Sequence, residues 1–221
     1  TEISPAYSGE NYYYEMRNQA NLTCRHQNLS EGISRSNEVI TSYTGTKNRV
    51  TDIGVKKYIS TFQEGIWKTD ATLSAVNDSY RYDFVIDVPW NEYGGYLEQF
   101  ELSDSLPAGV GLDGRIMEIY GNYPQRVDSW FQISMDGKNV SVKATPEALG
   151  NPAFYGKHYE MVLYVKMLSE ELLPSYNGNQ AFYVSENRYT LTTRQKGDGS
   201  ARTITSNAAI DRAVLIRPEP E

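Results

Sequence analysis

The sequence has 221 residues, of which 39% are hydrophobic and 12% aromatic, enough to bury a packed core. The formal net charge of −7 argues against nucleic acid and anionic membrane surfaces as partners. No apolar run approaches the roughly 18 residues of a membrane span, and no segment resembles a signal peptide. We therefore expect any export signal or wall anchor to lie outside these residues. The single cysteine, Cys24, rules out an internal disulfide.

A sequence segment near the start of the chain is repeated near its end. Residues 18–43 begin Asn-Gln-Ala-Asn-Leu-Thr-Cys-Arg and continue through a polar loop to Ser36-Asn37. Residues 187–216 begin Asn-Arg-Tyr-Thr-Leu-Thr-Thr-Arg and continue through a Gly-rich loop to Ser206-Asn207. Each copy follows a tyrosine-rich stretch. The repeat predicts two hairpins of the same design, although chance similarity between two Asn/Thr-rich hairpins is the alternative.

The repeat suggests how the chain is divided into domains. We expect residues 1–50 to be closing strands like those at the end of a preceding domain, and residues 51–217 to be a complete domain with its own closing hairpin. Residues 218–221, Pro-Glu-Pro-Glu, are typical of a stiff linker. Because closing strands without the rest of their domain leave unpaired edges, residues 1–50 are expected to dock on the main domain or pair with another copy.

The middle of the chain alternates apolar and polar residues between Gly, Pro and Asp-Gly turns, which is typical of half-buried strands. Tyrosine, with 18 copies against 6 phenylalanines, suits such strands because one ring face packs while the hydroxyl reaches water. Only Thr145–Leu149 and Ser169–Leu173 are expected as short helical turns. We predict an all-β, antiparallel, Ig-like sandwich. The clearest strands are Tyr80–Val88, Phe100–Leu106, Ile116–Tyr120, Val140–Lys143 and Tyr159–Lys166.

A second feature is a group of aromatic residues around the segment Val88–Tyr96. Exposed together on a concave surface, such rings would bind a glycan or a matrix protein. Packing of the tryptophans in the core or in loops is the alternative. The candidate ligand surface comprises Trp90, Tyr93, Tyr96, Tyr120, Tyr123 and Trp130.

Two charged residues fall on the apolar faces of expected strands. In residues 53–59, alternation places Lys57 with Ile53, Val55 and Ile59, and places Lys56 on the opposite face. In residues 100–106, Asp104 shares a face with Phe100, Leu102 and Leu106. A lone charge in an apolar site must pair or change its protonation state.

Such a pair has a chemical use as well as a structural one. Burial lowers the pKa of a lysine and raises that of an aspartate, so the neutral Lys57 amine could attack the side-chain carbonyl of Asn207 in the last strand. A protonated Asp104 would assist as ammonia leaves, and the product is an amide that joins the first and last strands. The alternative is a salt bridge at the rim of the sheet, with Asn207 as a turn residue.

Ordinary catalytic motifs are missing, and we expect no enzyme activity, no metal and no cofactor. The sequence contains no clustered His or Cys ligands, no G-x-S-x-G and no Gly-rich phosphate loop. A carbohydrate-active enzyme would need two facing carboxylates, for which Asp83, Asp87, Glu92 and Asp128 are conceivable but unsupported.

Several short motifs together resemble the isopeptide-forming domains of Gram-positive fimbrial proteins and of the antigen I/II C-terminal region, related to the collagen-adhesin A-type fold. The resemblance covers roughly residues 51–218, and residues 12–45 match the end of a preceding copy. The motifs are Val55–Lys57, Tyr80–Pro89, Phe100–Pro107 followed by Gly109–Leu112, and Ser206-Asn207.

The resemblance implies a bond between Lys57 and Asn207 with Asp104 as the assisting acid, and Asn37 as the matching asparagine of the preceding domain. It departs at Asp211 and Arg212, which interrupt an expected apolar strand end.

It also implies a function and a location. The chain is expected to be a stalk or adhesin module of a pilus or bacterial surface protein, extracellular and attached to the cell wall. Its expected partners are neighbouring domains of the same protein. A ligand-binding adhesin domain for a host glycan or matrix protein is the alternative.

Overall fold

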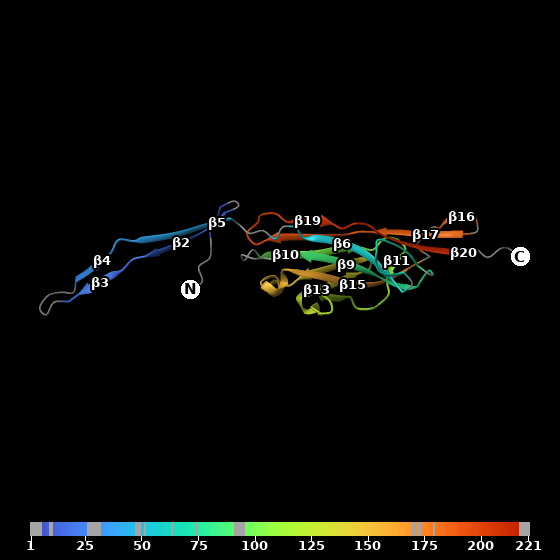
Figure 1. Cartoon of the computed structure of the whole chain (residues 1–221), viewed down its shortest axis with the longest axis horizontal. Coiled ribbons are helices and arrows are strands. Elements are labelled where there is room, and N and C mark those ends of the chain that lie inside the picture. The colour runs from blue at the N-terminus through green and yellow to red at the C-terminus, as the bar shows by residue number, and fades with distance from the viewer. Residues whose placement is uncertain are drawn as a thin grey trace. The chain divides into compact units, whose positions relative to one another are not determined.

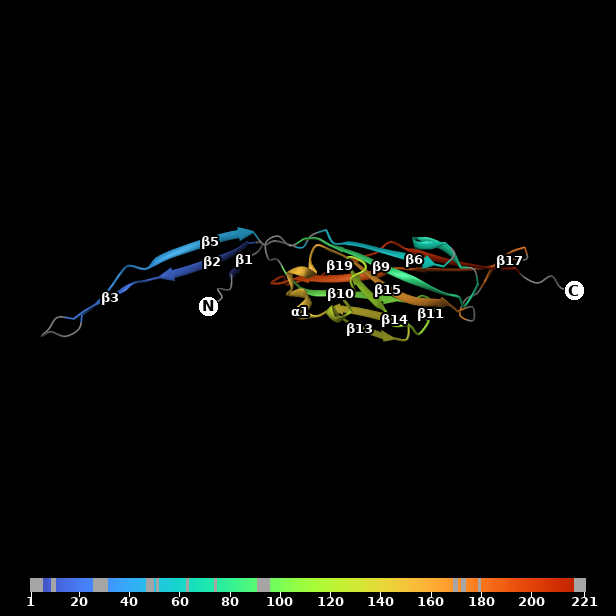
Figure 2. The same cartoon turned by 60° about the horizontal axis from the view of Figure 1, so that its bottom comes forward.

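The computed structural model describes residues 6–8, 11–25, 32–46, 50, 52–62, 64–73, 75–90, 96–168, 171, 174–178 and 180–216. Contacts divide the chain into two compact units, Thr1–Asn48 and Arg49–Glu221. Figures 1 and 2 show the strands of each unit from two directions. The expected linker, residues 218–221, lies outside the described residues.

The first unit consists of two antiparallel ladders. One is a three-stranded sheet in the order β1-β2-β5, and the other joins β3 to β4. None of the described side chains of this unit is buried. The strands are β1 (Ala6–Ser8), β2 (Asn11–Asn18), β3 (Asn21–Cys24), β4 (Gly32–Arg35) and β5 (Val39–Thr46).

The second unit contains three sheets. The six-stranded sheet has the order β11-β15-β9-β6-β7, with β12 also paired to β15, and the five-stranded sheet has the order β13-β14-β10-β18-β19. A four-stranded sheet, β16-β17-β20-β8, contains a parallel pair between β20 and β8, which departs from the expected antiparallel pattern.

The strands of the six-stranded sheet are β6 (Gly54–Thr61), β7 (Gly65–Lys68), β9 (Ser79–Val88), β11 (Val110–Leu112), β12 (Glu118–Gly121) and β15 (Lys157–Met167). Those of the five-stranded sheet are β10 (Leu97–Ser105), β13 (Phe131–Asp136), β14 (Asn139–Ala144), β18 (Tyr189–Gln195) and β19 (Arg202–Thr205). Those of the four-stranded sheet are β8 (Asp70–Leu73), β16 (Ser175–Asn177), β17 (Gln180–Asn187) and β20 (Ala209–Ile216). The helical turns are η1 (Asp128–Trp130), α1 (Pro146–Leu149) and η2 (Pro152–Phe154).

The predicted strands form, with ends displaced by up to three residues. The strand predicted over Ile116–Tyr120 begins later than the alternation indicated. Ile116 precedes β12 and is 82% exposed. The first expected helical turn is α1, where the hydroxyl of Thr145 accepts a hydrogen bond from the Ala148 amide at 3.1 Å. Most of the second, residues 169–173, lies outside the described residues.

The core lies between the six-stranded and five-stranded sheets. Phe84 of β9 meets Tyr189 of β18 edge to face at 5.2 Å between ring centroids, and Phe100 of β10 lies 6.4 Å from Tyr159 of β15. Every second residue along β9 is buried in this layer. These contacts confirm the predicted all-β sandwich.

The closing strands cross from one sheet to another at two places. β17 of the four-stranded sheet passes directly into β18 of the five-stranded sheet, and β19 returns to β20 through Ser206, Asn207 and Ala208. Asn187 ends β17, and Asn207 precedes β20. Both asparagines therefore lie where the chain changes sheets, close to the edge at which β6 and β8 contact β20.

Candidate functional site

A buried ion pair joins the two sheets of the sandwich. Nζ of Lys57 on β6 lies 2.6 Å from Oδ2 of Asp104 on β10, and both side chains are 0% exposed. Lys56, the next residue on β6, is exposed. Strand alternation thus places Lys57 among the core side chains, and the partner strand supplies its counter-ion.

Aromatic rings cover the rest of the lysine. Nζ lies 4.1 Å from the centroid of the Tyr82 ring and 4.7 Å from that of Phe84. Burial lowers the pKa of Lys57 from its usual 10.5 to about 8, while the negative charges of Asp104 and then Asp211 oppose this shift. A substantial fraction of the amine is therefore neutral at mildly alkaline pH.

Asn207 contacts the main chain of Lys57. Its Oδ1 accepts a hydrogen bond from the Lys57 amide at 2.9 Å, and its Nδ2 donates to the Lys57 carbonyl at 2.8 Å. The side-chain amide thus pairs with the backbone N–H and C=O of Lys57, as the backbone of a neighbouring strand would. The amine of Lys57 contacts Asp104, and its attack on Asn207 stays a prediction.

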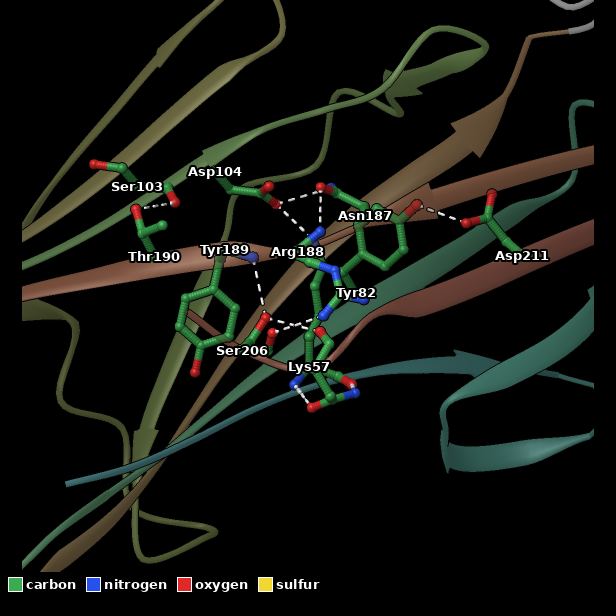
Figure 3. Close-up of polar contacts among 11 residues, drawn as sticks. Lys57, Tyr82, Ser103, Asp104, Asn187, Arg188, Tyr189, Thr190, Ser206 and Asp211 are labelled. Carbon is green, nitrogen blue, oxygen red and sulfur yellow. Dashed lines mark hydrogen bonds and ion pairs between the residues drawn. The ribbon is translucent and has the colours of Figure 1, made fainter. Parts of the chain in front are cut away.

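A different asparagine, Asn187, lies at the ion pair, and in the sequence it stands out only as the first residue of the second repeat. Nδ2 of Asn187 donates to Oδ2 of Asp104 at 3.2 Å, and its Oδ1 accepts from the Arg188 amide at 2.7 Å. Asn187 is 5% exposed. Figure 3 shows Lys57, Asp104 and Asn187 converging from three strands. The signal that could have identified Asn187 is its position at the end of a strand that enters the core.

Asp104 keeps one oxygen without a partner. Oδ1 is buried and has no hydrogen bond to any described residue. Residues Asp104 and Arg188 also line an open cleft of about 500 Å³ beside β10 and β14. The carboxyl group thus keeps one acceptor oxygen without a partner among the described residues.

A second buried acid lies beyond Tyr82. Asp211 on β20 is 0% exposed and accepts hydrogen bonds from the Tyr80 hydroxyl at 2.7 Å and the Tyr82 hydroxyl at 2.8 Å. Burial raises the pKa of Asp211 to about 6. Arg212 points the other way and pairs with Asp70 at 2.8 Å. The charged residues that interrupted the expected apolar strand end are thus one buried acid and one surface cation.

The aromatic candidates do not gather into one surface. Tyr93 lies outside the described residues. Among the described members, ring contact joins Tyr120 to Tyr123, at 5.1 Å, while Tyr96 and Trp130 pack against the core. Trp90 is 73% exposed and lies over Gly156. Two of the five described rings are therefore part of the packing.

The carboxylates considered for a carbohydrate-active enzyme have different neighbours. Glu92 lies outside the described residues, and Asp83 is buried beside Ser60 and Arg81. Asp87 lies 2.7 Å from Nδ1 of His158, and Asp128 pairs with Arg126. Within the described parts of the chain, no three His, Cys, Asp or Glu side chains could hold a metal ion, and no helix could cross a membrane.

Comparisons with known proteins connect this geometry to a fold. No protein-family model and no curated protein matches the sequence. The major pilin subunit BcpA of Bacillus cereus is similar over 73% of this chain and 40% of its own, with a TM-score of 0.51 and 10% identity. The 35 kDa C-terminal fragment of the major pilin GBS80 of Streptococcus agalactiae is similar over 72% and 56%, with a TM-score of 0.53 and 12% identity.

An adhesin domain has the same likeness. The C-terminal domain of the antigen I/II-family protein AspA of Streptococcus pyogenes matches 81% of this chain and 50% of its own, with a TM-score of 0.53 and 13% identity. The chain spans about half the length of these structures. The likeness confirms the fold that the sequence motifs implied: the described strands of the second unit form the sandwich fold found in Gram-positive pilins and antigen I/II C-terminal domains.

Proposed function

We propose that residues 50–216 are a structural module of a bacterial pilus or surface adhesin that closes itself with an amide bond between Lys57 and Asn187. Asp104 is the assisting acid. The observation that supports this most directly is that one oxygen of Asp104 contacts both Nζ of Lys57 and Nδ2 of Asn187, at 2.6 and 3.2 Å.

The contacts fit each step of such a reaction. The neutral amine attacks Cγ of Asn187, and negative charge develops on Oδ1, which the Arg188 amide already contacts at 2.7 Å. Asp104 accepts a proton from Nζ and delivers one to Nδ2. The Nζ–Cγ bond forms, the Cγ–Nδ2 bond breaks, and ammonia leaves, so no oxidant or cofactor is consumed.

Asn207 has a positioning role in this proposal. Its amide is engaged on both sides by the Lys57 backbone, which fixes the segment of β6 from which the amine extends. The Lys57–Asn207 bond expected from the motifs would require this side chain to release both hydrogen bonds. The amide of Asn187 instead contacts the same Asp104 oxygen as the lysine amine.

A module that uses up its own side chains acts once and is not an enzyme. The bond would join β6, the first strand of the sandwich, to β17 in the closing set, so that tension on the chain is carried by a covalent link. Domains of a major pilin subunit and of an antigen I/II-family protein have this fold. An extracellular location, with neighbouring domains or subunits as partners, follows from the same proposal.

Intact mass under denaturing conditions tests the bond. The full chain should be about 17 Da lighter than its sequence mass, the mass of one ammonia. Tandem mass spectrometry should place the cross-link between the peptides that contain Lys57 and Asn187. A chain with its full sequence mass would contradict the bond and leave the fold unaffected.

Matched variants separate the competing asparagines and lysines. Asn187→Ala and Lys57→Ala should each have their full sequence mass. Asn207→Ala and Lys56→Ala should still lose about 17 Da. If Asn207→Ala abolished the loss while Asn187→Ala retained it, the partner proposed here would be wrong. No cluster of the described aromatic rings favours the ligand-binding alternative.

A further inference from the structure

The first unit repeats the closing strands of the second, strand for strand. The order β1-β2-β5 matches β16-β17-β20, and the ladder β3-β4 matches β18-β19. The registers agree as well, because Asn18 pairs with Val39 and Asn187 pairs with Ala209. Asn18 therefore occupies in the first unit the place that Asn187 occupies in the second.

The hydrogen bonds at the sheet crossing are also repeated. The Ser36 hydroxyl accepts from the Ala20 amide at 2.9 Å and donates to the Asn37 carbonyl at 2.8 Å. In the second unit, the Ser206 hydroxyl accepts from the Tyr189 amide at 3.1 Å and donates to the Asn207 carbonyl at 2.9 Å. Both segments thus have the same local structure, although their loops differ.

The two copies differ in what covers them. Leu191 is 0% exposed, whereas the matching Leu22 is 62% exposed. Ala209 is 0% exposed, and the matching Val39 is 56% exposed. In the second unit the cover comes from strands that precede the closing set, with β10 beside β18 and β8 beside β20. Among the described residues of the first unit, β3 and β5 have no strand in those places.

The sheet β2-β5 has one charged face and one uncharged face. Arg17 forms ion pairs with Glu15 and Glu38, at 2.5 and 3.0 Å. Strand alternation places Asn18 on the other face, together with Met16 and Val39, which are 48% and 56% exposed. Such an exposed, uncharged face with apolar side chains, flanked by strand edges that have no partner among the described residues, is a surface for strand addition.

We propose that residues 11–46 close a second sandwich, and that Asn18 accepts an amide bond from a lysine on the strands that complete it. The partner is a strand set like residues 53–168, with a buried lysine in the place of Lys57 and a carboxyl group in the place of Asp104. The inference rests on the proposed function, because it assigns to Asn18 the role of Asn187. As there, Nζ–Cγ forms, Cγ–Nδ2 breaks, and ammonia leaves.

The partner is a set of strands that lacks closing strands of its own. The second unit of another copy does not qualify. In that unit the places beside β6 and β8 are already filled by its own β20, and the place beside β10 by its own β18. A second copy could enter only by displacing those strands and breaking the ladder from Gln180↔Ile216 to Asn187↔Ala209.

A tandem chain tests the inference by supplying the strands in the same polypeptide. Residues 50–174 are duplicated in front of residue 1 of the full chain, so the original second unit stays intact. The tandem chain should lose about 34 Da, two ammonias, against about 17 Da for the unextended chain. Asn18→Ala, or Lys57→Ala in the duplicated copy only, should reduce the loss to about 17 Da. Hydrogen exchange of the β2 and β5 amides should slow in the tandem chain.

The outcomes separate the two proposals. No mass loss in the unextended chain would contradict the Lys57–Asn187 bond itself. A loss of about 17 Da in the tandem chain, with unchanged exchange in β2 and β5, would overturn the closing role of residues 11–46. Slowed exchange without the second loss would support docking but overturn Asn18 as the acceptor. A dimer of the unextended chain that protects β5 would show that a second copy is the occupant and would also overturn the inference.

Discussion

Nζ of Lys57 lies 2.6 Å from Oδ2 of Asp104, and neither side chain reaches solvent. A buried ion pair is weak evidence for stability, because desolvation of the two charges offsets most of their attraction. This pair, however, also contacts an amide, since Asn187 donates to the same carboxyl oxygen at 3.2 Å. An acid shared by an amine and an amide nitrogen suits proton transfer between them, and the following predictions test that use.

The cross-link should stabilise the sandwich. A bond between residues 57 and 187 closes a loop of about 130 residues (187 − 57), for which the chain-entropy model of cross-links gives about 5 kcal/mol. We expect Asn187→Ala to lower the free energy of unfolding by several kcal/mol in guanidinium titrations. Asn207→Ala removes two hydrogen bonds to the Lys57 backbone and should cost about 1–3 kcal/mol, with the cross-link intact. Equal losses in the two variants would contradict a covalent role for Asn187.

Bond formation should speed up with rising pH. Only the neutral amine is a nucleophile, and burial lowers the pKa of Lys57 to about 8. When unfolded chain is diluted into buffers of different pH, the rate of ammonia loss should rise as pH approaches 8. The measurement is intact mass against time. A rate independent of pH between 6 and 9 would show that deprotonation of Lys57 does not limit the reaction.

Asp211 should shift that pH dependence. Its negative charge is one of the interactions that raise the pKa of Lys57, so Asp211→Asn should move the rate profile to lower pH. The matched control is Asp83→Asn, which alters another buried acid of raised pKa on the opposite face of β9. Asp83→Asn should leave the profile in place, and an equal displacement by both variants would argue against a specific effect of Asp211.

Asp104 should be required for the reaction. Asp104→Asn retains the shape of the side chain but cannot accept and return a proton, so this variant should have its full sequence mass. Its Lys57 also loses its counter-ion. Ammonia loss at the wild-type rate in Asp104→Asn would exclude the role given to this acid, whatever the effect on stability.

The unlinked lysine should make stability depend on pH. In Asn187→Ala the Lys57 amine stays free, with a pKa of about 8 when folded and 10.5 when unfolded. Between these values the unfolded chain binds more protons, so the stability of this variant should rise with pH, by up to about 3 kcal/mol. The control is Lys57→Met in the same background, which should lack this rise between pH 8 and 10. The absence of a difference would mean that Lys57 is not desolvated.

Local patterns in the sequence were sufficient for much of the fold. The period of two along β6 and β10 depends only on backbone geometry, so it places Lys57 and Asp104 on the inner faces without knowledge of the partner strands. The capping hydroxyl of Thr145 predicted α1 in the same way. For Asp211 the same reasoning was wrong. A charged residue in an apolar stretch suggests that the strand is interrupted there. The sequence does not show that the hydroxyls of Tyr80 and Tyr82 face this carboxylate and allow it to be buried within the strand.

The sequence alone could not predict which of two asparagines, Asn187 or Asn207, contacts the buried acid. Asn187 and Asn207 both lie next to closing strands, and the motifs of the resemblance favour Asn207. Which of them contacts the acid of the ion pair depends on where β17 and β19 leave their sheets, and that is decided by pairing between strands far apart in the sequence, such as β8 with β20 and β10 with β18. Alternation along one strand therefore determined that a lysine and an acid are buried. Only the packing of β6, β10 and β17 against one another determined that Asp104 contacts both Lys57 and Asn187.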